Sequence, residues 1–257
     1  MLQAGHLQAL AITASSYTHG EHVTFYDSRH AISPWTRTQR VAHRGALTHA
    51  HLLASSAIPF VFPAVSLNGP RGLAYFGDGA MRQLAPIAPA IHLGADRILV
   101  IGCGHLVEPP SIQEQPPSEP SLAHIAGHVL NSNFLDSLSV DLEHLQRINQ
   151  TVSLIPPELR HQTHLKPIEL LLIEPSERLD TIAAKYQRSL PQTVHNLLGV
   201  LGSRSNSATP QGSALLSYLL FEAAFTRELM ALGQADALAQ REDILHFFGW
   251  NCTSESA

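Results

Sequence analysis

The sequence predicts an α/β fold, in which a sheet domain is followed by a mainly helical C-terminal region. Three observations carry this prediction. Residues 73–101 run in the order strand, turn, helix, strand, which is the order of a β-α-β unit. The continuous apolar runs Arg97–Ile101 and Ile168–Ile173 are typical of strands covered on both faces. Apolar residues in Leu122–Gln150 recur with the spacing of an amphipathic helix.

The N-terminal part is expected to begin with a β-hairpin. Leu7–Tyr17 is rich in Leu, Ile, Ala and Thr, His22–Tyr26 carries Val, Thr, Phe and Tyr, and a turn-prone Thr-His-Gly-Glu sequence separates the two. Pro34–Ala50 mixes Arg, His and Thr without a clean period, which predicts an irregular loop. A short helix is then predicted over Leu52–Ile58, and Pro59 would end it.

The middle elements surround a glycine-containing turn. Leu73–Phe76 is predicted as a strand, and the turn Gly77-Asp78-Gly79 follows it. The two glycines are expected to supply backbone conformations that are closed to other residues. Ala85–Leu93 is predicted as a helix, and Gly94 marks its C-terminus.

The later part of the chain is predicted to be mainly helical. Glu108–Ser121 contains five prolines, which predicts an exposed, extended linker. A break in the long helix that follows is expected near Asn131–Asn133. Further helices are predicted over Pro191–Leu201, Ser213–Leu232 and Ala235–Phe248, with Gly233 between the last two. The predicted divisions of the chain are 1–107, 108–121 and 122–257, the last with one further sheet strand at 168–173.

Composition excludes several classes of protein. Hydrophobic residues make up 44% and charged residues 14% of the chain, which suits a buried core. The net charge of −5 argues against a nucleic-acid partner. The two cysteines, Cys103 and Cys252, have no paired spacing, which argues against a disulfide scaffold and a cysteine-ligated zinc site. No run is long enough to span a membrane. We expect a cytoplasmic protein without a cofactor, which at most touches a membrane surface.

Two segments resemble a known family. They are LASSAIPFVFPAV at 53–65 and YFGDGAMRQLAPIAPAIHLGADRILVI at 75–101. Their order resembles the second half of the patatin-like phospholipase domain, in which a small-residue helix and an A-x-P-x-x-F-P element precede an aromatic strand. That strand ends in Asp-Gly-Gly or Asp-Gly-Ala, and a helix and a G-A-D-[RK]-I strand follow. The triplet here is Asp78, Gly79 and Ala80. The resemblance implies that 1–107 is the C-terminal part of a three-layer α/β/α sheet domain.

The resemblance also implies a chemistry. Patatin-like enzymes hydrolyse acyl esters of lipids with a serine–aspartate dyad, in which the aspartate accepts the hydroxyl proton. Asp78 matches that aspartate. The family places the serine in a G-x-S-x-G elbow after a glycine-rich oxyanion loop, both N-terminal to the aspartate. This sequence contains no G-x-S-x-G, and 77 residues precede Asp78. We therefore expect a truncated lipid acyl hydrolase that is inactive alone.

The remaining serines have simpler explanations. Packing or strand positions account for the serines nearest to the expected pattern, so no nucleophile is assigned among them: Ser15, Ser16, Ser55, Ser56, Ser203 and Ser213.

Three further readings stay open. The chain is, as an alternative, a non-catalytic remnant that binds a partner or lipid. A weaker alternative is a metalloprotein, because His124 and His128 are four residues apart on a predicted helix, although no third ligand is evident. Arg37, Arg40 and Arg44 form a helically spaced basic strip that suits a solvated face or lipid phosphate. Loss of the nucleophile-bearing strand would expose a sheet edge, so self-association is expected.

Overall fold

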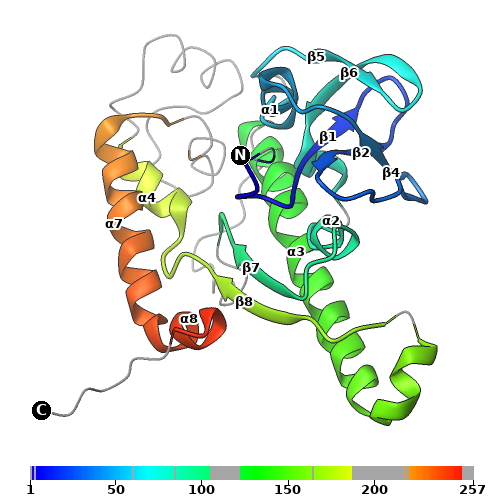
Figure 1. The fold of residues 1–257 in the computed structure, drawn as a ribbon. Helices are drawn as coiled ribbons and strands as arrows, with labels where there is room; N and C mark the ends of the chain where they lie inside the picture. Colours follow the sequence, from blue (N-terminus) through cyan, green and yellow to red (C-terminus); the bar gives the residue numbers. More distant parts are fainter. Residues whose placement is uncertain are drawn as a thin grey trace, which may run out of the picture. The chain divides into compact units, whose positions relative to one another are not determined.

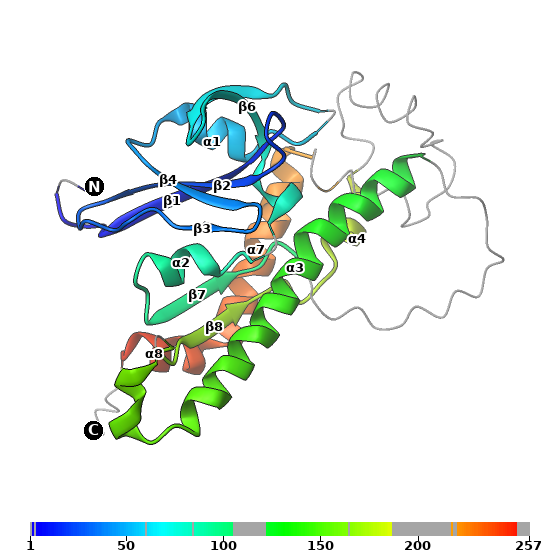
Figure 2. The ribbon, with the colours of Figure 1, turned by 90° about the vertical axis from the view of Figure 1, so that its right-hand side faces the viewer.

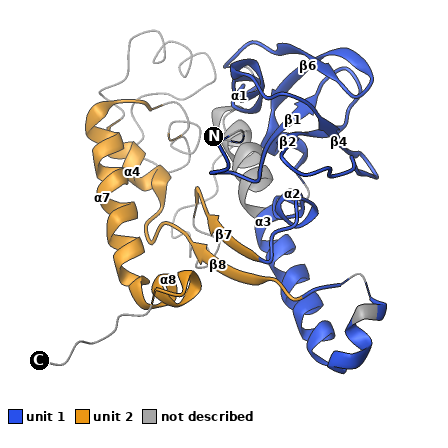
Figure 3. Cartoon of the chain, viewed as in Figure 1, with its two compact units in different colours: residues 1–96, 137–166 blue, residues 97–136, 167–257 orange. Residues whose placement is uncertain are grey.

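A computed structural model describes residues 2, 4–59, 61–83, 85–104, 122–163, 165–186, 217 and 220–250, without the side chains of 122–136 and 161. The chain divides into two compact units (Figure 3). The first contains residues 1–96 and 137–166, and the second contains residues 97–136 and 167–257. These units divide the chain differently from the sequence-based boundaries at 107 and 121. The predicted linker Glu108–Ser121 lies outside the described residues.

The first unit is built on a six-stranded mixed sheet with the order β3-β4-β2-β1-β6-β5 (Figure 1). The α/β class is thereby confirmed. Strands β2 and β4 run parallel, and every other neighbouring pair is antiparallel. The predicted N-terminal hairpin is present as β1 and β2. The strand bounds are β1 Ala9–Ser16, β2 His22–Ser28, β3 Thr36–Arg37, β4 Arg40–Arg44, β5 Val65–Gly69 and β6 Gly72–Asp78.

In this unit one local prediction is wrong, one strand was missed, and one predicted helix is present with shifted bounds. Pro34–Ala50 is not an irregular loop, because it contains β3 and β4, and β4 is held by its register with β2. Strand β5 was not predicted, and it pairs with β6 along its whole length. Helix α1 (His49–Ser55) begins before Leu52 and ends before Pro59. A capping box between Thr48 and His51 fixes its start.

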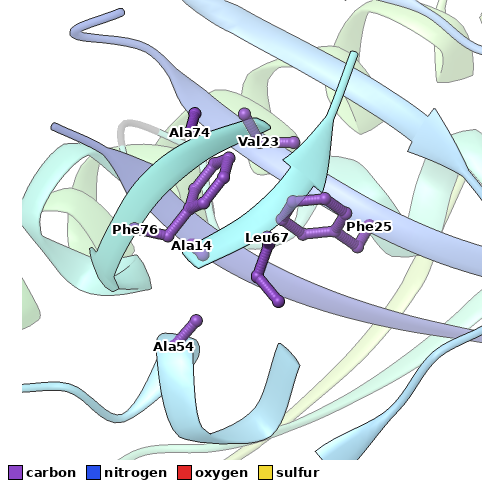
Figure 4. Packing of buried hydrophobic residues seen from close by; sticks show 7 residues of the cluster. All are labelled: Ala14, Val23, Phe25, Ala54, Leu67, Ala74 and Phe76. Atoms are coloured by element: carbon purple, nitrogen blue, oxygen red, sulfur yellow. The ribbon is translucent and has the colours of Figure 1, made fainter. Parts of the chain in front are cut away.

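The sheet has a different cover on each face. On one face, α1 contributes Ala54 to a core formed with β1, β2, β5 and β6, whose members are Ala14, Val23, Phe25, Ala54, Leu67, Ala74 and Phe76 (Figure 4). Successive strand residues point to opposite faces, so Tyr26 lies on the other side of the sheet from Phe25. There, Trp35 stacks between Tyr26 and His92 of α2 (Ala88–His92). Helices α1 and α2 thus lie on opposite sides of the β1–β2 hairpin (Figure 2).

The second unit contains a separate two-stranded parallel sheet, formed by β7 (Arg97–Ile101) and β8 (Glu169–Ile173). The β-α-β unit predicted over 73–101 is therefore wrong, because β6 pairs with β1 and β5 whereas β7 pairs with β8. The prediction that β7 is covered on both faces is also wrong, since Leu99 and Ile101 are exposed. A small core packs α4 (Leu179–Lys185) on α7 (Ala223–Ala239) through Ile182, Ala183, Leu220 and Phe225.

The long helices differ from prediction at their breaks. Helix α3 (Leu122–Ser153) is continuous, with no break near Asn131–Asn133. Helix α7 runs through Gly233, and the chain instead turns at Gln240 before α8 (Arg241–Phe248). Neither Asn131–Asn133 nor Gly233 ends a helix, because local propensity is a weak effect that the rest of the structure can override. The helix predicted over Pro191–Leu201 lies outside the described residues.

Candidate functional site

Asp78 is the last residue of β6, at the point where the chain leaves the sheet and enters a single turn of 3-10 helix, η1 (Gly79–Arg82). It pairs with Ala14 of β1, and its backbone N–H donates to the Ala57 carbonyl at 3.0 Å. The backbone around the carboxylate is therefore held by β1 on one side and by the end of α1 on the other. This is the fixed position that a catalytic carboxylate needs.

Asp78 as a whole residue is 6% exposed, and one of its two carboxylate oxygens accepts a hydrogen bond. Its Oδ1 accepts a hydrogen bond from the Ala80 backbone N–H at 2.9 Å. Within the described part of the chain, Oδ2 has no hydrogen-bond partner. Burial raises the pKa of Asp78, and the Ala80 N–H opposes that shift by stabilising the anion. The result is an anchored carboxylate with one oxygen available to accept a proton.

The two glycines beside Asp78 serve close packing, not unusual backbone conformation. Neither Gly77 nor Gly79 has a positive φ, so the conformational role predicted for them is wrong. A Cβ on Gly77 would overlap the phenol ring of Tyr17. A Cβ on Gly79 would lie 2.5 Å from the Thr13 carbonyl oxygen. The Gly-Asp-Gly pattern thus lets η1 lie directly against β1.

Two buried polar residues, Ser15 and His22, interact with the backbone of Gly79, and the sequence did not predict that they would meet there. Ser15 is buried, and its Oγ donates to the Gly79 carbonyl at 3.5 Å. His22, which pairs with Ser15 across the hairpin, is buried beside it. Burial, and then the charge of Arg40, lower the pKa of His22 to about 4, while a hydrogen bond with the Gly79 backbone acts in the opposite direction. His22 is therefore neutral at physiological pH. Cross-strand register was the signal that could have linked these residues.

Ser15, Ser16 and Ser56 are not placed as nucleophiles for Asp78, and Ser55, the last residue of α1, is half-buried. Ser15 and Ser16 are 3% and 2% exposed, which closes both hydroxyls to an ester. Ser16 Oγ accepts from the His19 backbone N–H, and Ser56 Oγ donates to the Leu52 carbonyl. These hydroxyls bond to backbone groups. The predicted strand position of Ser15 and Ser16 is confirmed, because both belong to β1. Ser203 and Ser213 lie outside the described residues.

The described residues give no geometric support to the metal hypothesis or to the basic-strip hypothesis. No group of three metal-ligating side chains occurs among the described residues, and the side chains of His124 and His128 are not among those described. Arg37 and Arg40 lie on the paired strands β3 and β4, so the helical strip is wrong. Arg44 donates to the carbonyls of Ser28 and His30. No helix in the described part of the chain is long and apolar enough to cross a membrane.

Comparisons with known proteins identify no relative. A scan against protein-family models, a search of curated proteins and a search of solved structures each gave no match to this chain.

Proposed function

We propose that this chain carries the aspartate half of a serine–aspartate acyl hydrolase site of the patatin-like type, with Asp78 as the proton acceptor. The observation that carries the proposal is the state of the Asp78 carboxylate. One oxygen is anchored by the Ala80 N–H, the other has no partner among the described residues, and burial raises its pKa. A raised pKa makes a carboxylate a stronger base, and the anchored backbone fixes its direction.

In the proposed reaction, a serine hydroxyl attacks the acyl carbonyl carbon of an ester. As the new C–O bond forms, the hydroxyl proton passes to the free oxygen of Asp78. The proton then leaves with the alcohol when the old ester bond breaks. In the second half, water attacks the acyl carbon of the acyl-enzyme and gives a proton to Asp78. As the bond between the acyl carbon and the serine oxygen breaks, Asp78 returns that proton to the serine oxygen, which restores the serine and releases the carboxylic acid. The serine belongs to a G-x-S-x-G elbow, a motif that this sequence does not contain.

The surroundings of Asp78 support an acyl lipid as the substrate. The backbone N–H of Asp78 donates to Ala57, just after α1, and the exposed outer side of that helix carries Leu52 and Leu53. These two side chains are 55% and 63% exposed. An exposed apolar surface on the helix that leads to Ala57 suits an acyl chain or a membrane surface. Helices on both faces of the six-stranded sheet support a three-layer, patatin-like arrangement of this unit.

The test begins with the in-frame coding sequence immediately upstream of Met1. The proposal expects a glycine-rich loop and a G-x-S-x-G there, and the extended protein should hydrolyse p-nitrophenyl butyrate. Asp78→Asn should abolish turnover, and Asp96→Asn, a surface change at a residue paired with Lys166, should leave it intact. An upstream stop codon, or turnover that survives Asp78→Asn, would overturn the proposal. The 257-residue chain alone should show no turnover above background.

A second candidate, a non-catalytic binding protein, is favoured by one observation. The hydroxyls of Ser15 and Ser16 are buried and bonded to backbone groups. An extended protein without esterase activity would favour this candidate over the hydrolase.

A further inference from the structure

A cavity of about 410 Å³ opens on the α1 face of the six-stranded sheet. Strands β2, β4 and β5, the 45–48 loop and α1 form its walls, and none of the residues that line it belongs to the Asp78–Ala80 motif. Its volume is in the range of small-molecule sites in proteins. Phe25, Leu47, Leu67 and Leu73 of β6 supply most of its apolar surface, and Phe25 and Leu67 lie on this face in Figure 4. The cavity is therefore separate from the proposed hydrolytic site.

Two histidines line the cavity and pack around the same ring. His51 meets the edge of Phe25 at a centroid distance of 4.7 Å, and His43 does so at 5.9 Å. Nε2 of His43 lies beside Gly45, where a Cβ would be 3.9 Å away, and Gly45 has no side chain to cover it. The lining contains no carboxylate. Two imidazoles without a negative neighbour favour a ligand that accepts hydrogen bonds.

The capping box fixes which nitrogen of His51 carries the proton. Nδ1 accepts from the Thr48 backbone N–H at 3.1 Å and lies 2.9 Å from the Thr48 hydroxyl. An N–H can only donate, so Nδ1 is the unprotonated nitrogen and Nε2 carries the hydrogen. Burial lowers the pKa of His51, and the hydrogen bond with the Thr48 backbone opposes this shift without reversing it, so the neutral ring predominates at pH 7. A metal ion would need a lone pair on Nε2, and so would require the cap to break.

We propose that this cavity binds a small monocarboxylate with an apolar body, which accepts hydrogen bonds from His43 and His51 and lies against Phe25 and Leu67. Carboxylate oxygens match the Nε2–H donor of His51, and hydrogen bonds to a charged partner are stronger than neutral ones. The apolar surface of the cavity selects the hydrocarbon part. This inference goes beyond the proposed function and does not depend on it.

The test is isothermal titration calorimetry of the full chain with hexanoate at pH 7. Hexanamide has the same shape without the charge, and it should bind about tenfold more weakly or not at all. His43→Gln and His51→Gln should each weaken hexanoate binding about tenfold. Glutamine at position 51 retains the capping box, because Gln is a natural acceptor at that helix position. His49→Gln on the same helix is the matched control, since His49 does not line the cavity.

Equal binding of hexanoate and hexanamide would overturn the proposal, as would the absence of heat at millimolar hexanoate. Equal loss in the His49→Gln control would also overturn it. Zinc titration is run in parallel, and zinc binding that depends on both His43 and His51 would replace the carboxylate with a metal site. Asp78→Asn should leave hexanoate binding unchanged, so failure here and failure of the proposed hydrolase are distinguishable.

Discussion

Replacement of the glycines around Asp78 should destabilise the first unit in a defined order. In Gly79→Ala, the new Cβ would lie 2.5 Å from the Thr13 carbonyl oxygen and 2.9 Å from its carbonyl carbon. Those atoms belong to the backbone of β1, which β2 holds in register, so the strand or η1 must move. In Gly77→Ala, the Cβ meets the ring of Tyr17, a half-exposed side chain that can swing away. Gly79→Ala should therefore cost more than Gly77→Ala.

The size of the effect follows from known cases of overpacking. An extra methyl group in a tightly packed position costs about 1–3 kcal/mol, and Gly79→Ala belongs at the upper end because backbone must shift. Gly77→Ala belongs near the lower end. Gly45→Ala is the matched control in the same unit, because its Cβ would make only ordinary contacts at 3.9 Å and 4.0 Å with His43. Its unfolding free energy should stay equal to the parent or rise by up to about 1 kcal/mol.

The two tryptophans allow the first unit to be followed by itself. Trp35 stacks on Tyr26 and His92 within this unit, whereas Trp250 stacks on Phe248 near the C-terminus. In a Trp250→Phe background, urea unfolding monitored by fluorescence reports on Trp35 alone, and the loss of unfolding free energy should be largest for Gly79→Ala. Equal stability of Gly79→Ala and Gly45→Ala would refute the close approach of η1 to β1.

Three further outcomes are expected. The pKa of His22 is about 4 in the folded protein and 6.5 in the unfolded chain. Between pH 4 and pH 6.5, His22 is therefore protonated in the unfolded state but neutral in the folded state. Stability should thus fall by roughly 3 kcal/mol as the pH drops from 6.5 to 4, a loss that His22→Gln should reduce in urea titrations at pH 4.5 and 7. Burial raises the pKa of Asp78, so its charged form destabilises the fold above that pKa, and Asp78→Asn should raise the urea midpoint at pH 7 but not at pH 3. The chain should self-associate in light scattering after size exclusion, and Ile101→Lys, at a β7 position that is 72% exposed, should reduce this; a monodisperse parent would contradict it.

The sequence predicted those helices and strands that have a recognisable pattern within their own residues. The β1–β2 hairpin, β6, β7, β8 and α3 all carry an apolar run, an alternation or a turn signal inside their own residues. Strand β4 carries none, because its place in the sheet comes from parallel pairing with β2. The separation of β7 from β6 was equally hidden, since pairing partners are chosen over long sequence distances.

At the candidate site, the sequence singled out Asp78 but not the residues that surround it in the structure. Asp78 was identified from its neighbours in sequence, and the structure places it at a buried strand end. The role of Gly77 and Gly79 was misassigned, because a motif does not tell conformational need from close contact. His22 and Ser15 were missed as partners of Gly79 because only the hairpin register and η1 bring them together.

A role for Asp78 as a helix cap alone explains its hydrogen bond but not its charge. A cap needs an acceptor, and Ser or Asn supplies one without burying a carboxylate. The helix that Asp78 caps is a single 3-10 turn, so attraction between its dipole and a negative charge is a small gain. The cost of burying the Asp78 anion opposes this gain. Within the described residues, the carboxylate has one hydrogen bond, from the Ala80 N–H, and burial raises its pKa. A charge kept at a cost in stability is typical of a group that handles protons. Under the proposed function, Asp78→Asn in the extended protein should both raise stability and abolish turnover, which is the signature of that trade.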